Sequence, residues 1–531
     1  MLMLLALALA LALAGCGHLP PGADYPRQYS TASAPDATSR LATRVGVLAR
    51  AHGGLSGFRL VPVGVDGFLV RAQMIDAAEQ TLDLQYYIFR ADETGRLLGR
   101  ALKRAALRGV RVRLLIDDGD PQGSAARIVA LDKVPGIAVR IFNPFAYRGH
   151  SKVLRGAEYL LDHRRLDRRM HNKLLVVDNA AAMIGGRNVG NQYFQMDPES
   201  QFADDDVFVI GPTVSSLSAT FDEFWNSPLA IPAAALANAP EAVTTGASAV
   251  TGTPAMASNY LGDLEDDGID YGLALASGEP YAGMLSGRLD LQWARAEVLS
   301  DSPAKSAKDS ADRGGRLLMP ALIAALGAAR SELVMVTPYF VPTAGELAVF
   351  SALRERKVRV RVLTNSLESS RGLLAHSGYM GHRPALLGKG VEINEIRSQL
   401  SSAHGSGQTS AMSAHGNYSL HAKLFVIDRR FLFVGSMNFD QRSIHLNTEI
   451  GLIIDSPVLA QQTVARFNAM TAPQNSYALS WRENRTGGAP DLLWRTNEAG
   501  RPVEYWQEPV RNAWDRYLAR LLSWLPIKHE L

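Results

Sequence analysis

Apolar and polar positions along the chain follow two periodicities, and their order occurs twice. Residues 70–116 begin with helical periodicity, continue with the alternating run TLDLQYYIF, and then repeat this order, ending in VRVRLLI. Residues 316–363 follow the same order, with ELVMVTPYF and VRVRVL as the alternating runs. A helix repeats about every 3.6 residues and a strand about every 2. The pattern therefore predicts a duplicated, mixed α/β domain.

Length and composition suggest how the chain is divided. With 531 residues, of which 47% are hydrophobic, it is long enough for two core-forming domains. We expect a first repeat over residues 56–237, a connecting segment over 238–315 and a second repeat over 316–475. The connecting segment is rich in Ala, Gly, Ser and Thr, with some strand character at LQWARAEVL. A further Ser- and Gly-rich segment, 398–418, is either a loop beside a site or an insertion.

Residues 476–531 predict a hairpin followed by an amphipathic helix. The apolar face of this helix consists of Val510, Trp514, Tyr517, Leu518, Leu521 and Leu525. Its arginines lie elsewhere, at Arg511, Arg516 and Arg520. Such a helix usually docks on the core of its own protein, but Trp and Arg also suit a membrane surface. Both interpretations stay open.

The beginning of the chain predicts an export signal. Residues 1–15 are apolar and uncharged, and Leu13-Ala14-Gly15-Cys16 resembles the bacterial lipobox, although no Lys or Arg precedes the apolar run. We therefore expect a signal peptide over 1–15, lipidation of Cys16 and a linker over 16–55; a plain signal peptide is the alternative. Cys16 is the single cysteine, which excludes disulfides and thiolate metal sites from the rest of the chain. No later stretch is apolar for long enough to span a bilayer.

Two copies of one short motif carry the candidate chemistry. HNKLLVVD begins at His171 and HAKLFVID at His421, and GGRN or GSMN follows each motif at the same distance. Because alternate residues of a strand share a face, the His and Lys of each copy project together. Core histidines would be the ordinary alternative, but the lysines would then be buried charges without cause. The candidate catalytic residues are His171, Lys173, Asp178, His421, Lys423 and Asp428.

The paired motifs resemble those of the phospholipase D superfamily, and the surrounding sequence over roughly 60–530 is most similar to its bacterial type C cardiolipin synthases. LDLQYYIF, LSDSPAK, YFVPT and NFDQRS are among the segments that carry this resemblance. The resemblance implies two α-β-α sandwich domains with mixed sheets, related by a pseudo-twofold axis, with one active site at their interface. It further implies a ping-pong reaction through a phosphohistidine, without metal or other cofactor.

The resemblance also implies roles for individual residues. Lys173, Lys423, Asn188 and Asn438 would hold the phosphate oxygens, and a carboxylate would orient each histidine. Glu449 matches the superfamily's position for this acid. In the first half Asp206 aligns with Glu449 by pattern, but its distance from the motif histidine is longer, so Asp204 and Asp205 stay open. Asp178 and Asp428 are expected to tie each motif strand to a neighbouring turn.

Three further groups of polar residues have two interpretations each. The arginines before the first motif are either a solvated basic run or a group that attracts anionic headgroups. They are Arg164, Arg165, Arg168 and Arg169. His376, Tyr379 and Arg383 match a type C pattern and either line an acceptor site or pack a helix. The acids Asp117, Asp118 and Asp120 are expected to be solvated strand-end residues, not metal ligands.

The implied activity is synthesis of cardiolipin, with phosphatidylglycerol as acceptor and phosphatidylethanolamine as donor. A phospholipase D that releases phosphatidic acid is the alternative, differing in whether water or an alcohol enters last. The net charge of only +3 and the expected lipid anchor argue against a nuclease and a nucleic-acid partner. Both motifs are complete, which argues against an inactive lipid-binding lipoprotein. We expect a monomer on the periplasmic side of a bacterial membrane, inner or outer.

Overall fold

The computed structural model describes residues 25–34, 38–120, 128–149, 151–197, 199–237, 283, 290–307, 315–400, 417–482 and 491–524. The expected signal peptide and Cys16 lie outside these residues, as do 401–416 of the second Ser- and Gly-rich segment. In the part of the chain that the structure describes, no helix is both long and apolar enough to cross a membrane.

The first half is built on a sheet in the order β10-β1-β8-β6-β5-β2-β3-β4-β9. β2, β3 and β4 are parallel to one another, and every other neighbouring pair is antiparallel. The strands are β1 (Ser56–Val61), β2 (Thr81–Tyr86), β3 (Arg111–Asp117), β4 (Ile137–Phe142), β5 (Lys173–Val177), β6 (Ala181–Gly185), β8 (Asp206–Ile210), β9 (Ala230–Pro232) and β10 (Gln292–Ala294).

The second half repeats this sheet. Its order is β11-β18-β17-β16-β12-β13-β14-β19-β20-β21, and from β11 to β19 each strand corresponds in place and direction to one from β1 to β9. The predicted duplication and mixed α/β fold are confirmed. The strands are β11 (Ala296–Ser300), β12 (Glu332–Val336), β13 (Arg359–Asn365), β14 (Glu392–Ile396), β16 (Leu424–Ile427), β17 (Phe431–Gly435), β18 (Ile450–Asp455), β19 (Ser476–Arg482), β20 (Asp491–Glu498) and β21 (Arg501–Tyr505).

The expected connecting segment contributes a strand to each sheet. β10 pairs with β1 at the edge of the first sheet, and β11 takes in the second sheet the place that β1 has in the first. The second sheet therefore already includes residues 296–300, which the sequence placed before the second repeat. These strands are short and follow one another directly, so their periodicity alone does not assign them to different sheets.

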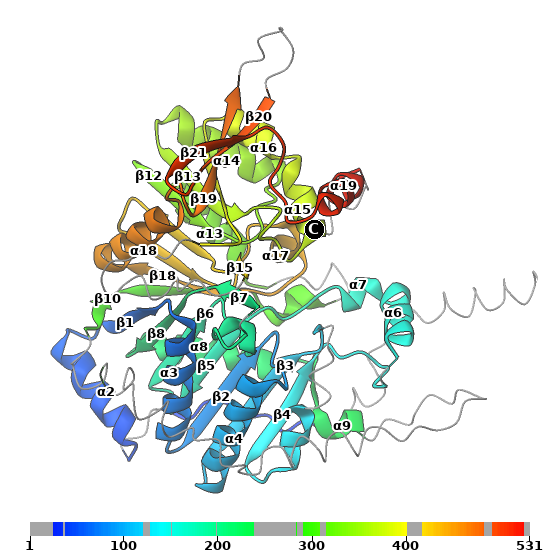
Figure 1. The fold of residues 1–531 in the computed structure, drawn as a ribbon. Coiled ribbons are helices and arrows are strands. Elements are labelled where there is room, and N and C mark those ends of the chain that lie inside the picture. Colours follow the sequence, from blue (N-terminus) through cyan, green and yellow to red (C-terminus); the bar gives the residue numbers. More distant parts are fainter. Residues whose placement is uncertain are drawn as a thin grey trace, which may run out of the picture.

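Helices cover the outer faces and fill the space between the two sheets (Figure 1). α3 and α4 pack on the outer face of the first sheet and α13 and α14 on that of the second, while α8 and α18 contribute to a core shared by both sheets. The helices are α2 (Arg40–Ala51), α3 (Gly64–Ala77), α4 (Glu93–Leu107), α6 (Lys152–Leu161), α7 (His163–Leu166), α8 (Thr213–Trp225), α9 (Ala233–Ala237), α13 (Leu318–Gly327), α14 (Ala344–Glu355), α15 (Leu373–Met380), α16 (Arg383–Gly388), α17 (Gln441–His445), α18 (Pro457–Met470) and α19 (Ala513–Leu522). Short 3-10 turns are η1 (Val129–Lys133), η2 (Asn191–Tyr193) and η3 (Pro303–Ser306).

A small parallel ladder links the halves beside the motifs. β7 (Ser200–Ala203) of the first half pairs with β15 (Asn417–Leu420) of the second. β15 leads directly into His421, and β7 leads directly into Asp204. The ladder therefore brings a motif histidine of one half next to an acidic residue of the other.

Candidate active site

The last residue of each motif anchors its strand. Asp178 and Asp428 have φ values of 50° and 53°, in the left-handed region, at the ends of β5 and β16. The Asp178 carboxylate accepts hydrogen bonds from the backbone N–H groups of residues 79–81, and Asp428 accepts those of residues 330–332. Both carboxylates lie at the opposite end of the strand from the motif lysine. Their placement matches the expected structural tie between each motif strand and a neighbouring turn.

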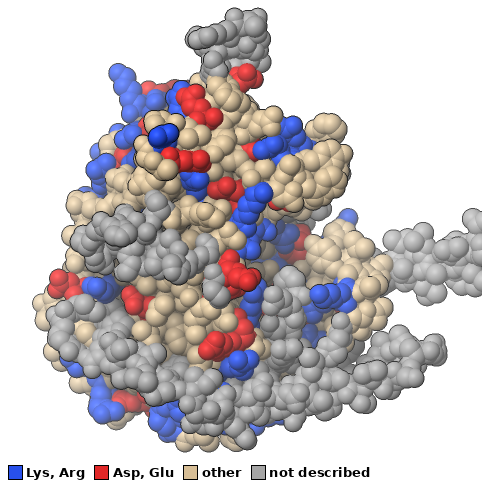
Figure 2. Space-filling view, in the orientation of Figure 1, with Lys and Arg blue, Asp and Glu red and all other residues tan. Residues whose placement is uncertain are grey.

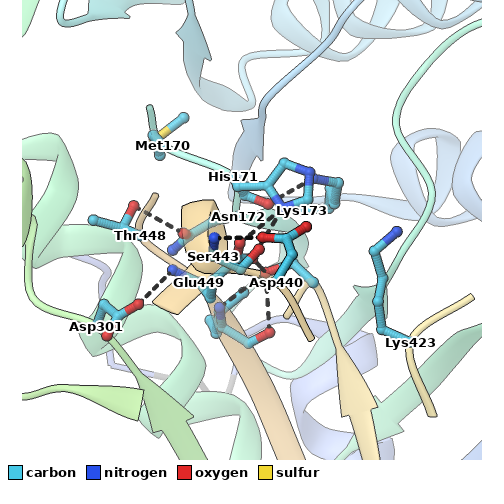
Figure 3. A network of polar contacts seen from close by, with 12 residues as sticks. Met170, His171, Asn172, Lys173, Asp301, Lys423, Asp440, Ser443, Thr448 and Glu449 are labelled. Atoms are coloured by element: carbon cyan, nitrogen blue, oxygen red, sulfur yellow. Dashed lines mark hydrogen bonds and ion pairs between the residues drawn. The ribbon is translucent and has the colours of Figure 1, made fainter. Parts of the chain in front are cut away.

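Each motif histidine contacts a carboxylate from the other half. His171 Nδ1 lies 2.9 Å from Glu449 Oε2, and His421 Nδ1 lies 2.5 Å from Asp204 Oδ2. An ionised carboxylate can only accept, so each ring donates from Nδ1 and leaves Nε2 available. Figure 3 shows His171 beside Glu449, with Lys423 reaching in from a separate segment. The site is therefore shared, because each motif histidine takes its carboxylate from the opposite half.

The structure corrects the acid predicted for the first half. Asp206 Oδ2 lies 2.9 Å from Arg71 Nη1 and 3.0 Å from Arg187 Nη1, so its charge is used in a buried ion-pair cluster. Asp206 is the first residue of β8, whereas Asp204 precedes that strand and reaches across the interface. Asp205 contacts neither histidine; its nearest cation is that of Arg466, at 3.4 Å.

The strand register explains the error. The N–H of Gly186 donates to the carbonyl of Asp205, and the N–H of Ser436 donates to that of Ile450. Asp205 thus corresponds to Ile450, which makes Asp204 the counterpart of Glu449. Three consecutive aspartates make this choice ambiguous in the sequence, and only hydrogen-bond register resolves it.

Backbone hydrogen bonds hold the two pairs in the same reciprocal way. His171 N donates to Thr448 O over 2.9 Å, and His421 N donates to Ala203 O over 2.8 Å. Thr448 and Ala203 are the residues immediately before Glu449 and Asp204. Such exchanged contacts are those that a twofold relation between the halves requires.

The motif lysines are buried beside the histidines. Lys173 Nζ donates to His171 O over 2.6 Å, while Lys423 Nζ donates to His421 O and lies 3.1 Å from His421 Nδ1. Burial lowers the pKa of Lys173 well below its usual value and lowers the pKa of Lys423 to about 8. These ammonium groups are the positive charges available in the site for an anionic ligand.

The two asparagines after the motifs differ in their contacts. Asn188 Oδ1 accepts from Ile88 N, and Asn188 Nδ2 donates to the Tyr193 hydroxyl over 2.9 Å. An amide nitrogen carries two hydrogens, so Asn188 keeps one for a ligand. Asn438 Oδ1 is buried and has no hydrogen-bond partner among the residues that the structure describes. Phosphate binding by Asn188 and Asn438 stays a prediction.

The two histidine–carboxylate pairs are electrostatically unlike. Burial, reinforced by the lysine charges, lowers the pKa of His171 well below its usual value and lowers the pKa of His421 to about 3. Burial raises the pKa of Glu449 to about 7. Burial also disfavours charge on Asp204, but His421 and Lys423 outweigh that effect, so the pKa of Asp204 lies below its usual range.

A side-chain difference accompanies this asymmetry. The Ser436 hydroxyl donates to Glu449 Oε2, whereas Gly186 occupies the corresponding place beside Asp204. A Cβ at Gly186 would lie 2.1 Å from Asp204 Oδ1, so no side chain fits there. The duplicated halves therefore support their acids by different means.

Residues to which the sequence analysis assigned no role hydrogen-bond to the backbone of the two carboxylate residues, Glu449 and Asp204. Asp301 Oδ2 accepts from Glu449 N over 2.9 Å and from Lys305 Nζ over 2.8 Å, and Lys305 also donates to Ser443 O (Figure 3). Behind Asp204, Arg187 donates to its carbonyl. Asp301 and Lys305 lie in the LSDSPAK segment, whose spacing alone does not reveal a contact with Glu449.

Aromatic rings line the histidines. The Tyr87 ring lies 5.1 Å from that of His171, edge to face. Tyr193 and Phe202 lie 5.3 and 5.2 Å from His421. These rings restrict the imidazoles to the orientations in which Nδ1 meets its carboxylate. Aromatic residues are common in protein cores, so the sequence offered no distinctive sign that these three contact the histidines.

The basic run before His171 is largely structural. Arg165 and Arg169 are buried; Arg165 binds Asp162, and Arg169 binds Asp117. Arg168 donates to the carbonyls of Arg164 and Lys305. Of these four arginines only Arg164 is exposed, which contradicts the expectation of a solvated or headgroup-binding run.

The three acids at the end of β3 are buried, not solvated as expected. Asp117 accepts from Met170 N over 2.8 Å besides binding Arg169. Asp118 accepts from Phe145 N over 2.8 Å and pairs with Arg148, and Asp120 is also buried. Within the described ranges, no cluster of three or more His, Cys, Asp or Glu side chains is placed to hold a metal ion.

The type C residues of the second half form a buried ion network. His376 Nε2 lies 2.7 Å from Glu508 Oε1, and Arg383 binds both Glu508 and Glu395. Tyr379 also donates to Glu395 over 2.9 Å. The network ties α15 and α16 to the segment before α19, which supports the packing interpretation over an acceptor site.

Most of the chain is similar to known proteins. A family model described as cardiolipin synthase, PLD-like domain matches residues 72–225 and 322–471. Cardiolipin synthase C of Escherichia coli K12 is 36% identical over 498 residues, covering 92% of this chain and 99% of that protein. A cardiolipin synthase of Halalkalibacterium halodurans is 24% identical and covers 74% of this chain and 61% of that protein.

Among solved structures, phosphatidylserine synthase from Haemophilus influenzae Rd KW20 is similar, with a TM-score of 0.50. It is 14% identical in sequence, and the match covers 82% of this chain and 92% of that one. At this identity the likeness concerns the fold alone.

The placement of Asp204 and Asp206 predicts different consequences for two matched substitutions. Asp204→Asn should lower turnover of a phosphodiester substrate by about 10²-fold or more while the thermal midpoint stays near that of the wild type, because a neutral amide orients His421 poorly. Asp206→Asn should lower the thermal midpoint instead, since it leaves two buried arginines without their anion, a loss of about 3–5 kcal/mol. Parallel kinetics and calorimetry compare them. Selective loss of turnover in Asp206→Asn with a normal Asp204→Asn would contradict the assignment.

The lowered pKa of Lys423 predicts the alkaline side of the pH profile. Its charge is present below about pH 8 and is lost as the pH rises through that value. In the free enzyme, kcat/KM should therefore fall above about pH 8. In Lys423→Arg the fall should move to higher pH, because a guanidinium stays protonated. An alkaline fall at the same pH in both proteins would assign it to another group.

Proposed function

The chain belongs to the phospholipase D superfamily as a cardiolipin synthase-like phosphatidyltransferase, and on this premise we propose that it makes cardiolipin. The proposed acceptor is phosphatidylglycerol and the proposed donor phosphatidylethanolamine. The observation that carries the proposal is the pair of histidines at the interface, each oriented by a carboxylate of the other half. The similarity over nearly the whole length of a cardiolipin synthase supports this choice of product.

In the first step of the proposed reaction, one imidazole Nε2 attacks the donor phosphorus. The new N–P bond forms as the bond to the donor's head alcohol breaks, and the second imidazolium gives its proton to the departing oxygen. In the second step the now neutral second imidazole takes the proton of the acceptor hydroxyl. The acceptor oxygen then bonds to phosphorus, and the N–P bond breaks.

The geometry supports these roles. Both Nδ1 atoms are held by carboxylates, so both Nε2 atoms remain for phosphorus and for proton transfer. Burial beside two lysines favours a neutral imidazole, the form that attacks. A bound phosphodiester anion offsets the charges of Lys173 and Lys423 and so favours protonation of the other ring. The lysines would also stabilise negative charge on the phosphate oxygens as it develops.

An assay with purified protein tests the identity of the product. Mixed with phosphatidylethanolamine and phosphatidylglycerol in a chelating buffer, it should form cardiolipin, detected by mass spectrometry. His171→Ala and His421→Ala should each lose this product by about 10²-fold or more, because each removes one partner of a two-histidine exchange. Activity that survives in either variant would contradict the shared site. Phosphatidic acid as the sole product would identify a phospholipase D.

The proposed localisation is a bacterial membrane. There the protein would act as a monomer that is anchored through Cys16 and faces the periplasm. The lipobox-like sequence supports the anchor. Cys16→Ser should move the protein from the membrane fraction toward the periplasmic fraction, measured by fractionation and immunoblotting. Density-gradient separation of the membranes then assigns the protein to the inner or the outer membrane. If lipid labelling marks the wild type and Cys16→Ser equally, lipid is not attached at Cys16, and the proposed anchor is refuted.

A further inference from the structure

One helix of the first half presents its apolar side to the exterior. α6 has no buried side chain, and Val153 and Leu160 are 79% and 75% exposed. Two of its polar side chains contact the protein instead: Glu158 accepts from the N–H groups of Ala146 and Tyr147, and Arg155 donates to Asp118 O. A helix that covers a core has the opposite arrangement. The outer face of α6 is therefore left for an apolar partner.

The C-terminal helix, α19, also presents apolar side chains to the exterior, in the second half. Trp514, Tyr517 and Leu521 are exposed on one face of α19, and Trp524 just beyond its end is 84% exposed. The rings of Trp514 and Tyr517 stack at 5.2 Å. On the opposite side Ala519 is buried. Part of the apolar face expected from the sequence thus points away from the protein.

Contacts connect both helices to the active site. Tyr159 of α6 donates to Asp167 over 2.8 Å, and Asp167 lies on the short path from α7 to His171. α19 packs against α15, and Arg371, just before α15, donates to Ser200 of β7, the strand that leads to Asp204. The two helices thus adjoin the two halves of the same site.

The pictures place these helices on one side of the molecule. In Figure 1, both helices project on the right, α19 above and α6 below the level where the halves meet. In Figure 2 the corresponding surfaces are mostly tan, and between them lies a recess in which Lys and Arg side chains are visible. Exposed basic residues belong to or adjoin the helices themselves, at Lys152, Arg164, Arg511 and Arg520.

We propose that α6 and α19 form a bilayer-docking face that turns the active site toward the headgroups of an anionic membrane. This inference rests on the proposed lipid substrate. Exposed Trp, Tyr and Leu side chains beside Lys and Arg are the composition of helices that lie in a membrane interface. The basic residues complement anionic phospholipid, each contributing about 1 kcal/mol near such a surface.

Depth-dependent fluorescence tests the docking directly, even if an N-terminal anchor already holds the protein on the vesicle. The full chain is bound to vesicles of phosphatidylethanolamine and phosphatidylglycerol whose acyl chains carry bromine, which quenches nearby tryptophan. The wild type should be quenched, and Trp514→Phe/Trp524→Phe should lose most of the quenched fraction. Quenching that is absent, or equal in both proteins, would overturn the proposal.

Kinetics tests the contribution of α6. Val153→Ser/Leu160→Ser should lower turnover of vesicle lipids at least tenfold and leave turnover of a short-chain, water-soluble phospholipid unchanged. Leu107→Ser/Val458→Ser, at exposed apolar positions on α4 and α18, should change neither rate. Equal loss on both substrates, or a dimer that the α6 variant abolishes in light scattering, would overturn the docking face. If the wild type turns over neither lipid, the proposed function fails, while the quenching still decides the docking.

Discussion

The contact of each motif histidine with a carboxylate of the opposite half is the interaction on which the site depends. His171 meets Glu449, and His421 meets Asp204, so the ring orientation in each half is determined by the other half. The backbone bonds from His171 to Thr448 and from His421 to Ala203 hold the same crossing in place. The core shared by the two sheets makes the crossing rigid. Duplication has thus produced one site, and each half supplies the support that the other lacks.

Burial gives this arrangement its electrostatic character. Two lysines, two imidazoles and two carboxylates lie together away from water, where charges interact more strongly than at the surface. The histidines are driven toward the neutral state and the lysines toward lower pKa values, so in the proposed reaction an anionic phosphodiester would offset the charges of the two lysines. Ser436 and Gly186 make the two halves unequal, which agrees with the proposed reaction, in which the two histidines have different roles in the first step.

Sequence reasoning predicted the duplication, the mixed sheets and the residues of both motifs, because these depend on local periodicity and exact spacing. It did not predict that the carboxylates cross between halves, since the crossing arises from the β7–β15 ladder and the Met170–Thr448 bridge, whose partners are far apart in sequence. It chose Asp206 over Asp204 because three adjacent aspartates differ only in strand register. Arg165 and Arg169 appeared as a surface charge run because their acidic partners, Asp162 and Asp117, are not recognisable from spacing.

The crossing itself can be observed by NMR of protein labelled with ¹⁵N in its histidine rings. The signals of His171 and His421 are assigned by their loss in His171→Gln and His421→Gln, and then followed in Glu449→Gln. The crossed arrangement predicts that this substitution shifts the ring-nitrogen signals of His171 and leaves those of His421 in place. A shift of the His421 signals with an unchanged His171 would show that each half orients its own histidine, which would contradict the account.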